Sequence, residues 1–177
     1  MAYPKITVNT GLVLDVIASD TIPIPAPDLP VLSGTTTAAT ANKLVDVGAD
    51  FSNVSVNDIV YNTTDNTSAT VTAIDTSTIL SISSDIFTSP EAYTIFLGGP
   101  NGSSRIDSSE GCLLYVGSNL ATMDVAKSYV FIKVQTVAGN DITFENFPVG
   151  NYLPIQIIKL YTTGTDAASR NSCIAIW

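Results

Sequence analysis

Short apolar runs that alternate with polar turn residues are the main pattern along the chain. In residues 129–137, Val130, Ile132 and Val134 fall on one face and more polar positions on the other, which is the two-residue period of a strand lying against a core. A turn containing glycine separates this run from the next, 141–145, as expected for a hairpin. No window repeats with the 3.6-residue period of a helix. The pattern therefore predicts an all-β protein.

The other apolar and β-branched runs have the length of ordinary strands and are bounded by Gly, Pro, Asn, Asp or Ser. The further predicted strands are 6–8, 12–14, 44–45, 54–61, 69–74, 79–82, 93–96, 112–116, 153–161 and 172–176.

Stretches rich in proline and glycine divide the chain into three parts. Prolines recur at every second or third position of 23–30 and favour extended backbone, so residues 1–34 are predicted to form an extended arm. Residues 35–97 hold four or five short strands and are predicted to form a small β module. A cluster of breakers begins at Gly98, so 98–177 is taken as the main domain. We expect an antiparallel β-sandwich or barrel formed by the C-terminal part, with an inserted small β-barrel and an extended proline-rich N-terminal arm.

The two ends of the chain are candidates for assembly contacts. Prolines space Ile22, Ile24 and Leu29 along the arm, which either wraps its own domain or lies across a neighbouring subunit. Trp177 follows an Ile-Ala-Ile run, which predicts a last strand docked within the domain or against a neighbour. These four residues form the predicted assembly interface.

Charge and composition argue against several classes of function. Acidic residues number 16 and basic residues 7, a net charge of −9, so binding to nucleic acid or to an anionic membrane is not expected. The chain has no histidine, which excludes Ser–His–Asp and Cys–His nucleophiles and His-containing zinc sites. Cys112 and Cys173 either form a disulfide or remain as unpaired buried thiols.

Scattered carboxylates are the only other candidates for catalysis or metal binding. They lie mostly in turns, where Asp commonly accepts hydrogen bonds from backbone amides. Among them are Asp46 and Asp50, Asp58 and Asp65, Asp107 and Glu110, and Asp141 and Glu145. A glycan-cleaving enzyme would need two of them to converge in a cleft, and no calcium-loop spacing occurs. We therefore predict no catalytic, cofactor-binding or metal-binding residue, and no enzymatic activity.

The C-terminal part carries a series of short motifs in a recognisable order. They are Leu-Tyr-Val-Gly at 114–117, Ile-Thr-Phe at 142–144, Phe-Pro-Val-Gly at 147–150, Leu-Pro-Ile at 153–155, Thr-Gly-Thr at 163–165 and the terminal Ile-Ala-Ile-Trp. With the arm, this order resembles small virion proteins of tailed bacteriophages, including the head spike base proteins of phage-like gene transfer agents. The resemblance covers residues 15–32 and 110–177. Residues 35–97 are a departure from that pattern, and resemble a small β module of marine phage structural proteins.

The resemblance implies a non-catalytic virion component, most simply a capsid decoration (cement) protein or a head spike base protein. Such a protein would assemble in the host cytoplasm, form a homo-oligomer, and contact the major capsid protein or other virion structural proteins. The insertion leaves a second interpretation open, a tail or fibre component that contacts other tail proteins or the host surface.

Overall fold

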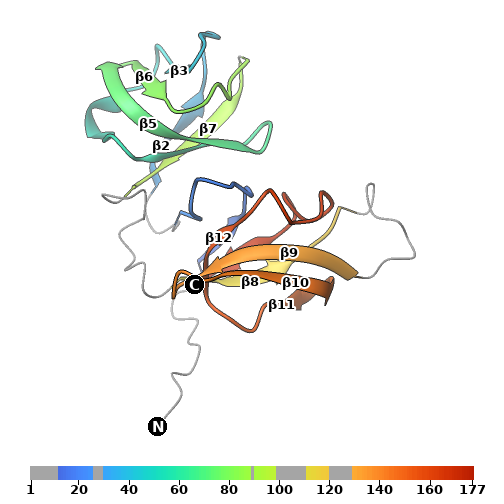
Figure 1. The fold of residues 1–177 in the computed structure, drawn as a ribbon. Coiled ribbons are helices and arrows are strands. Elements are labelled where there is room, and N and C mark those ends of the chain that lie inside the picture. Colours follow the sequence, from blue (N-terminus) through green and yellow to red (C-terminus); the bar gives the residue numbers. More distant parts are fainter. Residues whose placement is uncertain (1–11, 26–29, 89, 99–110, 120–128) are drawn as a thin grey trace.

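The computed structural model describes residues 12–25, 30–88, 90–98, 111–119 and 129–177. Within these ranges the chain forms β-strands and one short 3-10 helix, and every strand pair is antiparallel (Figure 1). The predicted all-β fold is confirmed.

Residues 30–98 form a curled six-stranded sheet with a core of its own (Figure 1). In spatial order its strands are β2 (Pro30–Thr35), β7 (Ala92–Phe96), β4 (Ile59–Asn62), β5 (Thr67–Thr76), β6 (Ile79–Ile82) and β3 (Lys43–Val45), with the helix η1 at Phe51–Asn53. The sheet curls until its two edges meet, since the amide of Thr37 donates to the carbonyl of Val45 at 2.8 Å. Inside, the rings of Phe51 and Phe87 pack against Tyr93, whose centroid lies 6.3 and 6.4 Å away. This module is a small, nearly closed barrel.

The strand pairing of the module begins earlier than the proline pattern indicated. Residues 30–34 were expected in the arm, whereas β2 begins at Pro30 and pairs with β7. Proline is compatible with the first residue of an edge strand, because no partner there needs its missing N–H. Pro30 is paired with Phe96, so the two ends of the module lie side by side.

Because its ends are adjacent, the module is expected to be removable. Replacing residues 30–98 with a short Gly-Ser linker should leave the remaining strands folded, since those strands have a separate core. Circular dichroism and a cooperative thermal transition would measure this. A chain that loses its β signal after excision would show instead that the two units fold only together.

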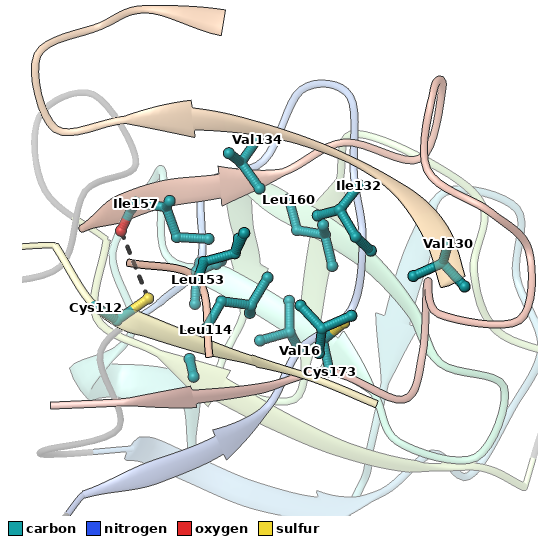
Figure 2. Packing of buried hydrophobic residues seen from close by; sticks show 13 residues of the cluster. Val16, Cys112, Leu114, Val130, Ile132, Val134, Leu153, Ile157, Leu160 and Cys173 are labelled. Carbon is teal, nitrogen blue, oxygen red and sulfur yellow. Dashed lines mark hydrogen bonds between the residues drawn. The ribbon is translucent and has the colours of Figure 1, made fainter. Parts of the chain in front are cut away.

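The C-terminal residues form a two-layer sandwich. One layer has four strands, in the order β1 (Val13–Asp15), β13 (Ile174–Ile176), β8 (Leu113–Val116) and β11 (Asn151–Tyr152). The other has three, in the order β10 (Asp141–Pro148), β9 (Tyr129–Thr136) and β12 (Ile157–Leu160). Figure 2 shows buried side chains from both layers, among them Leu114, Ile132 and Val134, meeting in one core. The alternation in 129–137 thus marked the correct buried face.

The run 153–161, predicted as one strand, forms a strand only at Ile157–Leu160, and residues 153–156 cross from one layer to the other. β11 ends at Tyr152 in the four-stranded sheet, and β12 begins at Ile157 in the three-stranded sheet. Pro154 lies in the bend between them, where it has no ladder hydrogen bond to lose. The crossing brings Leu153 and Ile157, both fully buried, into the core from the two sides.

The described part of the arm, residues 12–25, wraps its own chain. β1 adds an edge strand to β13, and the amide of Val16 donates to the carbonyl of Cys173 at 2.9 Å. Further on, the amides of Ser19 and Ile24 donate to carbonyls of β12 residues, both at 2.9 Å. The arm is therefore hydrogen-bonded to both layers of the sandwich.

The same arm joins the sandwich to the inserted module. Ile17 and Ile22 form a small apolar cluster with Ile59, Tyr61 and Phe96 of the module. The last two rings meet edge to face, with centroids 5.3 Å apart. Apolar packing through the arm thus holds the two units together.

Candidate interaction surface

The structure places two of the four predicted interface residues inside the molecule. Ile22 is 7% exposed in the cluster between the units, and Ile24 is 9% exposed in the sandwich core. Leu29 lies outside the described residues. Trp177 is half-buried against the sandwich core, and its amide donates to the carbonyl of Leu12 at 3.1 Å. Ile22 and Ile24 therefore stabilise the chain's own fold, and the last strand docks within its own domain.

The cysteines are separate, buried thiols. β13 pairs with β8, and continuing this register by one residue places Cys173 opposite Val116. Val116 lies four residues from Cys112 along the chain, and both cysteines are free. Four residues of strand span about 13 Å, well beyond the reach of a disulfide. Each thiol contacts a backbone carbonyl instead, Cys112 that of Ile157 (Figure 2) and Cys173 that of Ser169. Burial raises the pKa of each thiol to about 12, so neither is a thiolate nucleophile at neutral pH.

Two buried carboxylates have structural partners. Asp58, 1% exposed, accepts hydrogen bonds from the amides of Ser55 and Gly98, each at 2.8 Å. Asp46, 7% exposed, accepts a hydrogen bond from the Tyr93 hydroxyl at 2.8 Å. Both side chains accept hydrogen bonds from donors of their own module. They therefore stabilise its turns and the interior of the barrel.

Among the described residues, Asp65 and Glu91 are a pair of carboxyl groups that the fold brings into contact. Glu91 is buried and accepts hydrogen bonds from the hydroxyl and the amide of Thr88, at 2.7 and 2.8 Å, and from the Asn62 amide group at 3.0 Å. The Thr88 bonds lower the pKa of Glu91, whereas the hydrogen bond to Glu91 raises the pKa of the exposed Asp65. The hydrogen bond between the two groups therefore favours a proton on Asp65, shared with Glu91, over the free carboxylate. Carboxyls in direct contact lack the separation of about 5 Å or more that glycoside hydrolysis requires.

This pair predicts a pH-dependent gain in stability from one substitution. A carboxyl whose pKa is raised by folding contributes stability that is fully present below its unfolded pKa, near 4, and is lost as the pH rises through the raised pKa of the folded state. Asp65→Asn keeps a donor for Glu91 and removes the ionisation. We expect a small rise in melting temperature at pH 7 relative to wild type, and little difference at pH 4. A melting temperature that falls at pH 7 would contradict the shared proton.

A polar cleft of about 440 Å³ lies where the arm meets both units. It is lined by arm residues 17–20, the β4–β5 turn, and loop residues near Thr162 and Arg170. Its two carboxylates are engaged elsewhere: Asp65 with Glu91, and Asp20 with the amide and hydroxyl of Thr163 at 2.9 and 2.7 Å. These Thr163 bonds lower the pKa of Asp20. The cleft can hold a small polar ligand, but the two carboxylates form no acid–base pair there.

The described ranges contain neither a cluster of metal ligands nor a membrane-spanning helix. No three Cys, Asp or Glu side chains there are grouped so that they could share a metal ion. No helix in that part of the chain has the length and apolar character needed to cross a lipid bilayer.

The strongest surface feature is the side of the four-stranded sheet that faces away from the core. We call it the outer face. Strand register places one row of side chains from Val13 through Ile176 to Leu113, and a second from Asp15 through Ile174 and Tyr115 to Tyr152. Six of these seven residues are aliphatic or aromatic. The residues between the two rows, such as Leu114 and Ala175, point into the core and are fully buried.

The outer face is open to solvent at both ends. Val13 on β1 is 61% exposed and Tyr152 on β11 is 56% exposed, while the four apolar residues between them are partly exposed. The rings of Tyr115 and Tyr152 meet edge to face, with centroids 5.3 Å apart. Apolar side chains on both sides of a sheet are typical of a sheet that is covered on both sides. Among the described residues, the chain's own core covers this sheet on one side only.

The sequence held a signal for this surface that the strand prediction did not use. The runs 12–14, 113–116 and 174–177 are apolar at consecutive positions and do not alternate with polar residues. A strand with one wet face is expected to alternate, as β9 does. Continuous apolar character in three strands of one sheet therefore points to contact on both faces.

Comparisons with known proteins do not identify the chain. No protein-family model matches it, and no match was found among curated proteins or solved structures. Its function is therefore inferred from its own residues and contacts.

Proposed function

We propose that the protein is a non-catalytic structural component of a tailed-phage virion, a capsid decoration protein or a head spike base protein. The observation that carries the proposal is the outer face, on which six of seven residues are apolar. Apolar side chains that adjoin one another on the outside of a sheet, and are not scattered singly, are candidate contact sites. The motif order of residues 110–177, which resembles that of small virion proteins, supports the virion as the place of assembly.

The architecture also suits a subunit that must keep its shape. The arm is hydrogen-bonded to both layers of the sandwich and packs against the module, so the two units are not joined by linkers alone. Four of the described ionisable groups serve the fold: Asp58 and Asp46 hold amides and a hydroxyl, and the two thiols are buried and protonated. On this proposal, the chain acts through its contact surfaces and not through a reaction.

A tail or fibre component is the second candidate, and the polar cleft is the feature that favours it. The cleft lies between the inserted module and the sandwich, and it exposes hydroxyl, amide and guanidinium groups. Groups of this kind bind polar ligands such as the sugars of a host surface. In that case the module would face outward at the end of a tail.

Location in the particle tests both candidates. Phage particles encoding this sequence would be purified, washed and analysed by mass spectrometry, and their density would be mapped by electron cryo-microscopy. We expect a fixed copy number that matches head symmetry, with the chain on the capsid or at a spike base. Density at the tail tip would favour the second candidate, and absence from washed particles would overturn both.

A further inference from the structure

We infer that the polar cleft between the arm and the two units is a binding site for a neutral sugar. Its volume of about 440 Å³ lies within the usual range of ligand pockets, roughly 300–1,000 Å³. The inference deepens the second candidate function, a tail or fibre component, and rests on it only for the source of the sugar.

Arg170 provides hydrogen-bond donors that the protein itself does not use. Its Nε donates to the carbonyl of Thr165 at 2.9 Å, which holds the half-buried guanidinium group in the wall of the cleft. Among the described residues, its two Nη groups have no acceptor and the side chain forms no salt bridge. A planar guanidinium group offers parallel N–H donors to a pair of neighbouring oxygens. Adjacent hydroxyls of a sugar ring present such a pair.

The other walls add donors and acceptors from separate segments of the chain. Strand register places Ser68 opposite Tyr61, which packs against the arm, so the Ser68 side chain lies on the side of the sheet that faces the arm. Asn66 and Asn171 line the cleft with exposed amide groups. Each carboxylate oxygen of Asp20 accepts one hydrogen bond from the protein and has a second lone pair for a ligand. The cleft therefore matches a ligand whose groups both donate and accept hydrogen bonds, as sugar hydroxyls do.

The charges of the cleft favour a neutral ligand. The guanidinium group of Arg170 and the carboxylate of Asp20 have opposite charges, and Asp65 is engaged with Glu91. The whole chain carries a net charge of −9, which disfavours phosphorylated, sulfated or uronic-acid ligands. The half-buried side chain of Ile86 adds a small apolar part of the wall, against which the C–H groups of a sugar ring can pack.

Titrations of the full chain, followed by NMR of its backbone amides, would measure the binding. The probes are glucose, galactose and mannose, each compared with its uronic acid. None of the described lining residues is aromatic, so a single ring should bind weakly, with a dissociation constant on the order of 1–10 mM. We expect at least one of the neutral sugars to bind, and to bind at least fivefold more tightly than its uronic acid.

Two substitutions test the residues that carry the inference. Arg170→Lys keeps the positive charge and removes the parallel donors, and we expect at least tenfold weaker binding. Asn66→Gly removes an amide group and suits the φ of 55° at this position, and we expect about threefold weaker binding. The matched control is Asn42→Gly, at the same φ of 55° in the module and away from the cleft, which should bind as wild type does. Thermal melts would confirm that each variant is folded.

Three outcomes would overturn the inference: no binding of the neutral sugars up to about 100 mM, equal binding by all variants, or tighter binding of the uronic acids. A neutral polymer of the sugar that binds separates the two sources. Tighter binding of the polymer per ring supports a surface glycan, and equal binding supports a free sugar. A protein that binds no sugar but is located at the tail tip keeps the second candidate function and loses this inference.

Discussion

Removing residues 1–25 is expected to abolish the cooperative unfolding transition of the C-terminal sandwich. The deletion removes edge strand β1 and the amides that bond to Cys173 and to β12. It also removes Val16 and Ile24 from the core, and Ile17 and Ile22 from the cluster between the units. Both layers of the sandwich lose contacts in one step.

The size of this effect follows from the four buried side chains. Burying a valine or isoleucine contributes about 1.5–3 kcal/mol, so the four together contribute roughly 6–12 kcal/mol. A domain of this size has a total stability of about 5–15 kcal/mol. The deletion therefore removes an amount comparable to the whole free energy of unfolding.

The matched control removes only residues 1–11 and keeps every contact described for the arm. Thermal melts followed by circular dichroism would compare the two deletions with wild type. We expect the shorter deletion to melt cooperatively and the longer one to lack a transition. If the longer deletion melts within a few degrees of wild type, the arm is not part of the folding unit.

The strands were predictable from sequence where the local pattern and the tertiary contacts agree. β9 alternates between the core and solvent, and its hairpin to β10 turns at Gly139, whose φ of 81° suits glycine. β6 and β8 likewise follow short apolar runs between turn residues. In these places the identity of each residue decides which side it faces.

The path of the arm was not predictable because its residues are compatible with two environments. Ile22 and Ile24 between prolines indicate an extended, apolar segment, and such a segment is stabilised equally well by its own domain or by a neighbour. The two environments are distinguished only by the folded structure, in which the amide of Ile24 donates to a carbonyl of β12. β2 escaped prediction for a similar reason, since its pairing with β7 joins residues about sixty positions apart.

The candidate surface was predictable only in part. The apolar runs that form the outer face are visible in the sequence, but strand order decides that three of them lie side by side in one sheet. Conversely, proximity in sequence did not identify the partners of the carboxylates Asp58 and Asp65, and the pair Asp107 and Glu110 lies outside the described residues. Asp58 reaches across the module to Gly98, and Asp65 reaches Glu91. Function and stability therefore depend on contacts between distant segments.

Asp58 is the side chain of the inserted module whose loss is expected to cost the most. Its two carboxylate oxygens hold the amide of Ser55, before β4, and the amide of Gly98, after β7, each at 2.8 Å. At Gly98 the backbone packs so closely that a Cβ atom would lie 1.9 Å from the carbonyl oxygen of Asn57. The carboxylate thus fastens the segment leaving the module to the start of its central strand.

Asp58→Ala would leave two amide donors without this acceptor in a site that is 1% exposed to solvent. Hydrogen bonds to a charged group contribute about 1.5–3 kcal/mol each, so we expect a loss of about 3–5 kcal/mol in the free energy of unfolding. Asp58→Asn keeps one acceptor oxygen and should fall between wild type and Asp58→Ala. The control is Asp50→Ala, which removes an exposed cap of η1, bonded to the amide of Ser52 at 3.0 Å, and should cost about 1 kcal/mol.

Urea titrations of the four proteins would give these free energies, and the order among them separates a structural role from a catalytic one. A carboxylate that serves the fold gives the order Asp58→Ala, Asp58→Asn, Asp50→Ala, wild type, from least to most stable. Catalytic groups are often retained at a cost in stability, so removing one commonly leaves the fold unchanged or more stable. An Asp58→Ala protein as stable as wild type would therefore return this buried carboxylate to the list of candidate functional groups.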